Sequence, residues 1–483
     1  MPEAQPAKAQ PAKAQTGPRN YQLYFKIAFL VLLVLGSLIP LTLVRALVLE
    51  REGLSETVKQ EVSATWGQEQ RILGPVLTIP FDEHRIVQVP NPDKDSRVPF
   101  VDKEVVKRKL IHLLPETLTI EAEVTTSVRR RGIYEVPLYT LKSRFDGGFA
   151  RPDLEVLGIE PEDVVLWDKA RIEVFIADLS GSLNAVALDW GGQVIPFRLD
   201  GEAESYASRI VAPLPSLAPG QTWPEAFGFA LDLNGSGSLG VMPLGKATHM
   251  ALESSWPHPG FTGSVLPVRS EISDSGFTAD WEVSHFARQI PQQWRSDRMT
   301  LQDLLQRSYA SGLVTRLVEP VDHYLKTERS VKHGVLFVLL ISAVIFAFEV
   351  MTGGRVHFIQ YGMIAAALCI FYLLLLSFSE ILGFAPAYAI AAGLSVTLIT
   401  LYVAKIAGGW RRGGIVGAVL GAVYGYLYTT LQSEDHALIM GALLLFFALA
   451  ALMFATRNVD WYGLGGQALR PARGTPATAE EQA

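Results

Sequence analysis

The chain has 483 residues, 49% of them apolar, and carries 42 Lys and Arg against 48 Asp and Glu, a formal net charge of −6. This length exceeds the size at which one hydrophobic core keeps growing, so we expect at least two folding units. The basic residues form no stripe, which argues against nucleic-acid binding. The single cysteine, Cys369, excludes an intrachain disulfide and a cysteine-ligated metal site, and its apolar neighbours predict a small core residue.

The amino-terminal region predicts a tail followed by a membrane anchor. Residues 1–23 repeat the unit AQPAK and have nothing to bury, so we expect a disordered cytoplasmic tail. Residues 27–44 are apolar and uncharged, long enough to cross a bilayer as a helix. No small-x-small cleavage site follows, so we favour an uncleaved anchor helix over residues 24–47 rather than a signal peptide.

Residues 48–332 predict a large domain rich in β-strands. Leu54, Val58 and Val62 are four apart and suit an amphipathic helix leaving the membrane. Short apolar runs with period-two alternation then follow, which predicts an antiparallel β-sandwich-like domain rather than a Rossmann or barrel-type enzyme. The turn signals between these runs are Asn91-Pro92-Asp93, Asp146-Gly147-Gly148, Gly191-Gly192 and Asn234-Gly235.

Five further apolar runs predict a membrane domain over residues 333–456, followed by a cytoplasmic tail over residues 457–483. The runs cover residues 335–348, 358–378, 385–404, 415–431 and 437–455. Short links make neighbouring spans antiparallel. The links holding Arg355 and Arg411 are basic, whereas those holding Glu380 and Glu434 are acidic, an alternation typical of the positive-inside rule.

The predicted fold class is therefore an α+β membrane protein. One amino-terminal and five carboxy-terminal transmembrane helices enclose the β-sandwich-like domain between the first and second helices. The charge pattern predicts a multi-pass protein of a bacterial inner membrane, with both termini in the cytoplasm and the β-rich domain in the periplasm. Its first partner is then the lipid bilayer.

One long segment carries a family resemblance. Residues 254–281, SSWPHPGFTGSVLPVRSEISDSGFTADW, resemble the signature region of the CreD family, inner-membrane proteins linked to envelope integrity, stress response and colicin tolerance. GPVLTIP, RRGIYEVPLY, PVDHY, FEVMTGGRVHFIQY, FYLLLLSFSEILGF and FATRNVDWY also match, so the resemblance runs from about Tyr24 to Tyr462. Ile381 stands where a His is expected after Glu380. The resemblance implies the same topology and supplies no catalytic residues.

The soluble half offers few candidates for a site. It contains no Walker loop, dinucleotide fingerprint, HExxH or GxSxG motif, so we expect no catalytic residue and no cofactor. Two prolines stiffen the backbone around Trp256 and His258. We interpret this pair either as a rigid connection with Trp256 in the core or as a presented pair that binds glycan or peptide. His249 and His258 could meet across a hairpin, but we expect no metal site.

The membrane half offers two acidic residues and a glycine stripe. Glu349 and Glu380 end the second and third spans, where we expect anchoring or pairing rather than a proton relay. Gly417, Gly421 and Gly425 are spaced four apart, a pattern that permits close helix packing within the cluster or between two copies.

Three functions remain open from the sequence. The first is a non-enzymatic protein of envelope integrity whose periplasmic domain binds a protein, glycan or lipid partner. The second is a transporter or channel-like component built from the six spans. The third is a glycan- or lipid-modifying enzyme whose carboxylates, Glu271, Asp274 and Asp280, meet in a cleft.

Overall fold

The computed structural model describes most of the chain in two units, which we name the helical unit (Met1–Gly53 with Val321–Ala483) and the sheet unit (Leu54–Pro320). The described residues are 21–90, 99–200, 207–215, 217, 226–288, 290–304, 306, 312–319, 323–352, 356–406, 408–432 and 437–457. The predicted tail over residues 1–20, the end of the chain after residue 457, Arg355 and the turn at residues 91–93 lie outside them.

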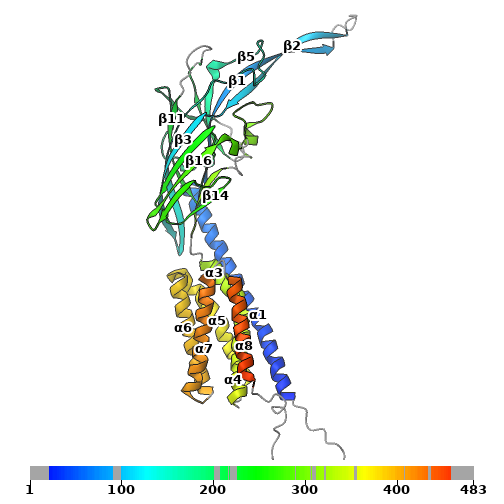
Figure 1. Ribbon diagram of the computed structural model, residues 1–483, viewed down its shortest axis with the longest axis vertical. Helices are drawn as coiled ribbons and strands as arrows, with labels where there is room; N and C mark the ends of the chain where they lie inside the picture. The colour runs from blue at the N-terminus through cyan, green and yellow to red at the C-terminus, as the bar shows by residue number, and fades with distance from the viewer. Residues whose placement is uncertain are drawn as a thin grey trace, which may run out of the picture. The chain divides into compact units, whose positions relative to one another are not determined.

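Seven helices are described. They make up the helical unit, except that the last part of the first helix, after Gly53, belongs to the sheet unit. They are α1 (Tyr21–Trp66), α3 (His323–Lys332), α4 (Gly334–Thr352), α5 (Phe358–Leu382), α6 (Phe384–Ile406), α7 (Trp410–Gln432) and α8 (Ala437–Thr456). All but α3 are long and apolar enough to cross a membrane, which confirms the predicted one-plus-five arrangement within the described residues (Figure 1).

Two details of the helices differ from the sequence prediction. The predicted anchor and the predicted amphipathic helix form one continuous helix, α1, which ends before Gly67. Gly67 has a φ of 149°, a conformation that side-chain-bearing residues rarely adopt. Helix α3 lies in the stretch that we assigned to the β-rich domain, but it packs against α5 and belongs to the helical unit.

Aromatic rings fill the centre of the helical unit. Phe371 and Tyr372 on α5 are fully buried, and Phe371 packs edge-on against Tyr388 of α6 and Tyr424 of α7. The hydroxyl of Tyr388 donates a hydrogen bond to the backbone carbonyl of Tyr424 at 2.8 Å. Cys369 is buried in the same core, as expected for a small core residue.

The sheet unit contains two sheets. The ten-stranded sheet comprises β1 (Gln70–Pro90), β2 (Phe100–Leu113), β5 (Val164–Val165), β6 (Arg171–Ile176), β9 (Arg198–Leu199), β10 (Ser208–Pro213), β12 (Ser238–Val241), β14 (Pro259–Gly263), β17 (Gln293–Arg295) and β18 (Leu313–Leu317). The eight-stranded sheet comprises β3 (Thr117–Arg131), β4 (Tyr134–Gly148), β7 (Ala187–Trp190), β8 (Gln193–Pro196), β11 (Phe227–Ser236), β13 (Ala247–Ser254), β15 (Arg269–Ser273) and β16 (Gly276–Ser284).

One hydrophobic core joins the two sheets. It includes Ile79 and Phe81 of β1 as well as Ile120 of β3 and Trp281 of β16. Strand β3 alternates between exposed and buried residues, as expected for a strand with one face in the core. This arrangement agrees with the predicted sandwich. Two pairings, β1 with β12 and β3 with β13, are parallel and were not predicted.

Two of the predicted turns are wrong. Asn234 and Gly235 lie inside β11, where Gly235 leaves room for the ring of Tyr139 on the neighbouring strand. Gly147 lies inside β4, where a Cβ would meet the ring of Phe227. Glycine serves close approach at both positions, which the sequence alone does not distinguish from a turn. The turn at Gly191 is confirmed between β7 and β8, with a φ of 58°.

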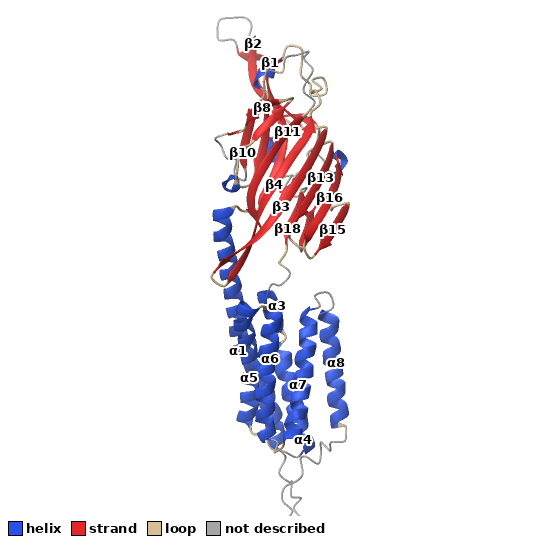
Figure 2. Ribbon diagram, turned by 90° about the vertical axis from the view of Figure 1, so that its left-hand side faces the viewer, coloured by secondary structure: helices blue, strands red, loops and turns tan. Residues whose placement is uncertain are grey.

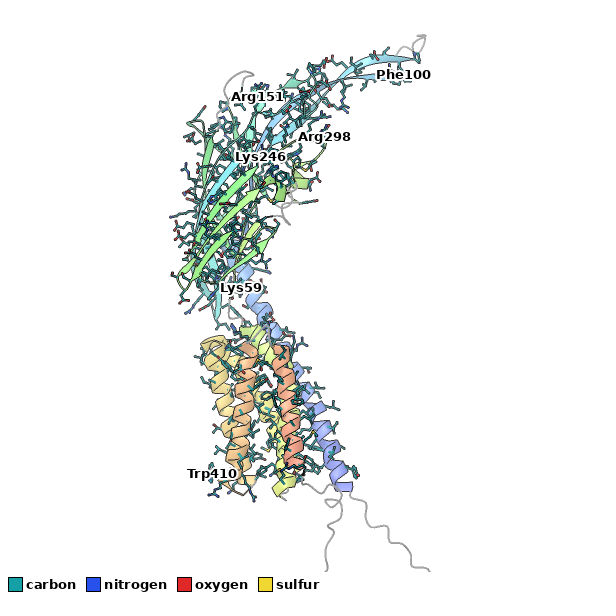
Figure 3. The ribbon with its side chains drawn as sticks, in the orientation of Figure 1. Lys59, Phe100, Arg151, Lys246, Arg298 and Trp410 are labelled. Atoms are coloured by element: carbon teal, nitrogen blue, oxygen red, sulfur yellow. The ribbon has the colours of Figure 1, made fainter. Side chains whose placement is uncertain are left out.

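Strand β1 changes its partners along its length. Near Gln70 it pairs with β12, then with β6, and from Leu77 onward with β2. Strand β5 reaches β1 only at Phe81 and Asp82. Among the described strands, residues 85–90 and 100–105 therefore pair only with each other, and we name this two-stranded segment the arm. Figure 1 shows it extending beyond the rest of the sheet unit, and Figure 3 places Phe100 at its far end.

Candidate functional site

The arm carries two faces of different charge. In its antiparallel register Arg85 lies opposite Val105, Val87 opposite Lys103, and Val89 opposite Val101. Partners in register share a face of the ribbon, so this face carries four valines with cations and no acid. We name it the valine face, and its residues are Arg85, Val87, Val89, Val101, Lys103 and Val105.

The opposite face of the arm is acidic and also apolar. It carries Glu104, which binds His84 at 2.6 Å, and Asp102. Ile86 is 75% exposed and Phe100 is 52% exposed. Apolar side chains on both faces of a two-stranded ribbon have no core to cover them, so the arm is a candidate binding surface.

A buried ion network holds the base of the arm. Glu83 is ion-paired with Lys109 at 2.7 Å and with Arg295 of β17, and Arg85 reaches it at 2.9 Å. Asp297 completes the network by binding Lys109 at 2.6 Å. Burial opposes ionisation of both carboxyl groups, but the hydrogen bonds from Lys109 and Arg295 outweigh it. The pKa of Glu83 is therefore lowered, and that of Asp297 falls to about 2.

The outer face of the eight-stranded sheet is hollowed. Figure 2 shows the neighbouring strands of this face, and the hollow has a volume of about 550 Å³. The small residues Ala230 and Ala251 form the floor of the hollow, and longer side chains stand on either side of them. We name it the acidic hollow after its carboxylates, which are Glu121, Glu123, Asp232, Glu253 and Asp280.

Trp256 has a structural position. Its indole nitrogen donates to the carbonyl of Val318 at 3.1 Å, and its ring packs against the core of the sheet unit. The backbone of Val318 in turn donates to the carbonyl of His258 at 3.1 Å, while the His258 side chain is exposed. These contacts agree with the rigid-connection interpretation. Glycan or peptide binding by the pair stays a prediction.

The other candidates of the soluble half lie apart from one another. His249 is on the outer face of β13 and His258 is in the connection after it, and the described residues contain no group of three or more His, Cys, Asp or Glu suited to a metal ion. Asp280 lines the acidic hollow, whereas Glu271 and Asp274 belong to the β15–β16 hairpin and do not line it.

Glu349 forms a cluster at one end of the helical unit. Its carboxylate is ion-paired with Lys26 of α1 and accepts a hydrogen bond from the hydroxyl of Tyr361 at 2.8 Å. The backbone nitrogen of Val356 donates to it at 3.1 Å, and Lys26 donates to the Val356 carbonyl at 3.0 Å. The cluster joins α1, α4 and α5, so Glu349 pairs as the sequence analysis expected.

Glu380 belongs to a second cluster, which joins α1, α3 and α5. The Tyr324 hydroxyl donates to its carboxylate at 3.2 Å, and Arg51 lies 3.9 Å away. Nearby on α3, Glu328 binds Arg45 at 2.9 Å. Ile381, which stands where a His was expected, is 76% exposed.

The two clusters bracket the apolar part of α1. Lys26 and Arg45 are separated by about 28 Å of helix at a rise of about 1.5 Å per residue. That distance is close to the thickness of a hydrocarbon core, about 30 Å. The ion pairs therefore attach α1 to the other helices at both ends of its apolar stretch, where charges are less costly than at its centre.

The glycine stripe on α7 divides into two parts. Gly417 is buried against α6, and a Cβ there would meet the Thr400 side chain. Gly421 and Gly425 have open space where a Cβ would stand. Packing inside the cluster therefore explains Gly417, and association of two copies through Gly421 and Gly425 stays a prediction.

The sequence analysis missed the arm, its ion network and the acidic hollow. The alternation of Val87 and Val89 with Val101 was visible, but it predicts a strand and not the absence of neighbours. The partners Lys26 and Glu349 each end an apolar run on the side predicted as cytoplasmic, and this shared position was the available signal for their pairing.

Comparisons with known proteins agree with the six apolar helices described above. Residues 22–462 match the family described as "Inner membrane protein CreD". The chain is 31% identical over 448 residues to Inner membrane protein CreD of Escherichia coli (strain K12), covering 91% of this chain and 94% of that protein. A solved M1 zinc metallopeptidase from Deinococcus radiodurans shares 14% identity over 42% of each chain, with a TM-score of 0.21. The chain therefore belongs to the CreD family of inner membrane proteins.

Proposed function

We propose that this inner membrane protein is not an enzyme, and that it contributes to cell envelope integrity by presenting a binding domain in the periplasm. The six apolar helices anchor it, with both termini in the cytoplasm, and the sheet unit binds an envelope partner. The observation that carries this proposal is the arm, a two-stranded ribbon that has apolar side chains on both faces and no neighbour among the strands that the structure describes.

The arm needs a partner for a physical reason. An isolated two-stranded ribbon is marginally stable in water, because half of its backbone groups and most of its side chains remain solvated. Proteins rarely leave such an edge apolar, since it pairs with other chains. On the valine face Val87 is exposed, and Arg85 and Lys103 add positive charge, so a partner that is both apolar and anionic would cover this face.

Photocrosslinking in living cells tests the proposal. A photoreactive amino acid is placed at Val87 on the valine face of the intact protein. Val194, which is 72% exposed on β8 against 38% for Val87, is the control because it is the more accessible valine and lies outside the arm. We expect a reproducible adduct from Val87 and none from Val194. Equal labelling at both positions, or none at Val87, would contradict binding at the arm.

The proposed orientation has a separate test. The sole natural cysteine, Cys369, is buried, so single introduced cysteines report their own accessibility. A membrane-impermeant thiol reagent added to cells with a permeabilised outer membrane should label Gln88→Cys on the arm. It should label Trp410→Cys, which is 73% exposed at the start of α7, only after the inner membrane is broken. The reverse pattern would overturn the proposed orientation.

Loss of the arm surface should also affect the envelope. The double variant Val87→Asp with Val101→Asp introduces charges on the valine face without touching the core. We expect cells carrying it to admit more of a normally excluded dye than cells with the natural protein, at equal protein level. The control is Ser273→Asp, which is exposed on β15 in the eight-stranded sheet, whereas both strands of the arm belong to the ten-stranded sheet.

A further inference from the structure

We propose that the partner of the arm is a second copy of this chain, and that the valine face of one copy lies in the acidic hollow of the next. This inference rests on the proposed function, since it identifies what the arm binds. It starts from two surfaces of opposite charge on the same chain, the valine face with Arg85 and Lys103 and the hollow with its five carboxylates.

The charges of the acidic hollow are not balanced within it. Lys142 is the register partner of both Glu123 and Asp232, and it stands between them on the sheet. Arg144 is ion-paired with Asp146 at 2.7 Å. The lining of the hollow holds these two cations against five carboxylates, which leaves an excess of negative charge over the floor.

The carboxylates lie in two rows across neighbouring strands, and the first row also holds two cations, since Arg144 is the register partner of Glu121 and Arg269 is the register partner of Asp280. Asp280 of β16 is the register partner of Ala251, and Ala251 is the register partner of Glu121 on β3. In the next row, Glu253 of β13 is the register partner of Glu123. Like charges in such positions repel each other, so cations placed above these rows would be stabilised.

The dimensions of the two surfaces are compatible. The hollow runs from β16 across β13, β3 and β4 to β11, which is four strand spacings of about 4.8 Å, or roughly 19 Å. The arm is two strands wide. Its valines can lie over Ala251 and Ala230, which are too small to obstruct them, while Arg85 on one strand and Lys103 on the other face the carboxylates on either side.

The contact has a consequence for assembly. The valine face and the hollow are different surfaces, so each copy offers one of each. A contact of this kind is head-to-tail, and it produces rings if the rotation closes or open rows of molecules if it does not. We therefore expect assemblies larger than a dimer in the membrane, at concentrations where the contact forms.

Cysteine crosslinking between two differently tagged copies tests the contact. One copy carries Val87→Cys and the other Ala251→Cys, and the buried Cys369 gives little background. With a short bifunctional thiol reagent we expect a mixed adduct from this pair in membranes. Val87→Cys with Val194→Cys is the matched control, and its adduct should be at least tenfold weaker. Equal adducts from the two pairs would overturn the proposed contact.

Charge reversal is a second test of the contact, and it introduces no cysteine into either surface. Arg85→Glu with Lys103→Glu should reduce the photoadduct from Val87 at least tenfold, and so should Glu121→Lys with Glu253→Lys. A mixture of these two variants should restore the adduct, because each then supplies the charges that the other lacks. Damage to folding would not be repaired in this way, so failure of the mixture would overturn the inference.

The identity of the adduct separates this inference from the proposed function. An adduct between two copies of the chain supports both. An adduct with a different protein or with a lipid overturns the second copy as partner and leaves the proposed function standing. No adduct from Val87 overturns both.

Discussion

Lys26 of α1 and Glu349 of α4 form an ion pair although 323 positions separate them in the chain. Their side chains are only 17% and 10% exposed, so the pair is largely shielded from water. The hydroxyl of Tyr361 and the backbone of Val356 satisfy the remaining groups. The first helix is thus attached to the others by a specific contact as well as by apolar packing.

Removing one partner should loosen α1. Lys26→Met leaves the Glu349 carboxylate without its cation, and losing one member of a shielded pair costs about 3 kcal/mol. We expect a lower unfolding temperature of the purified protein in detergent. The exchanged pair, Lys26→Glu with Glu349→Lys, should recover part of the loss. An unchanged unfolding temperature in the single variant would show that apolar packing alone attaches the helix.

The ion network at the base of the arm should be sensitive to acid. Because the folded-state pKa values of Glu83 and Asp297 are lowered, their contribution to stability is present above the unfolded values, near 4, and is lost as the pH falls through the folded-state values, which for Asp297 is about 2. Glu83→Gln should remove most of this contribution at neutral pH, by about 3 kcal/mol, since it leaves the Arg295 charge buried. Hydrogen exchange of the amides of β1 and β17 would report it.

The control for that experiment is Glu104→Gln, a carboxylate that is exposed on the arm and pairs only with His84 among the contacts described. Exchange in β17 should not change in this variant. Faster exchange in β17 in both variants would mean that the ribbon as a whole, and not the buried network, holds the base of the arm.

His112 should produce a second acid transition at higher pH. Burial, with a smaller contribution from the Arg171 charge, lowers its pKa from 6.5 to about 3, and its ring contacts Thr78 and Trp294. The folded state then binds fewer protons than the unfolded state, so stability falls as the pH drops from 6.5 toward 3, by up to about 1.4 kcal/mol per pH unit.

The substitution His112→Asn isolates this effect, because it retains a polar atom near the Thr78 hydroxyl and cannot take up a proton. We expect the stability of the sheet unit to become flat between pH 6.5 and pH 5, where the carboxylates have not yet been protonated. If the natural protein and His112→Asn have the same slope in this range, the imidazole does not govern it.

The glycines of α7 offer a paired test. Gly417→Val should lower the unfolding temperature, because the new side chain would meet Thr400 of α6. Gly421→Val is the matched control, with the same change in helix propensity and open space around the Cβ. We expect it to leave monomer stability unchanged. A smaller species for Gly421→Val than for the natural protein, measured by size in detergent, would support association of copies through this part of the stripe.

The elements of the fold were largely predictable, because the bilayer and the sandwich both impose strong patterns. Uncharged runs such as residues 27–44 must be helices in lipid, and the alternation around Ile120 must be a strand with one buried face. Strand order was not predictable. Gly235 carries the same signal whether it forms a turn or makes room for Tyr139, and only the neighbouring strand decides.

The candidate site was harder to predict for a related reason. A binding surface here depends on what is missing beside a strand, and local sequence does not encode missing neighbours. Val87 and Val89 have the pattern of an ordinary core strand. Trp256 drew attention because prolines flank it, yet its indole is satisfied by Val318 within the fold.

The pairing of β1 with β12 has a consequence for biosynthesis. Gln70 is the register partner of Leu239, so the first strand to emerge from the ribosome waits for one made much later. At about 5–20 residues per second, this delay lasts roughly 10–30 s. During that time Gln70, Arg71 and Ile72 of β1 lack their partners on β12, although β2 and β6 have already been made. Completion of the ten-stranded sheet is therefore a late event, and a nascent chain of this protein should depend on chaperones that protect exposed strands.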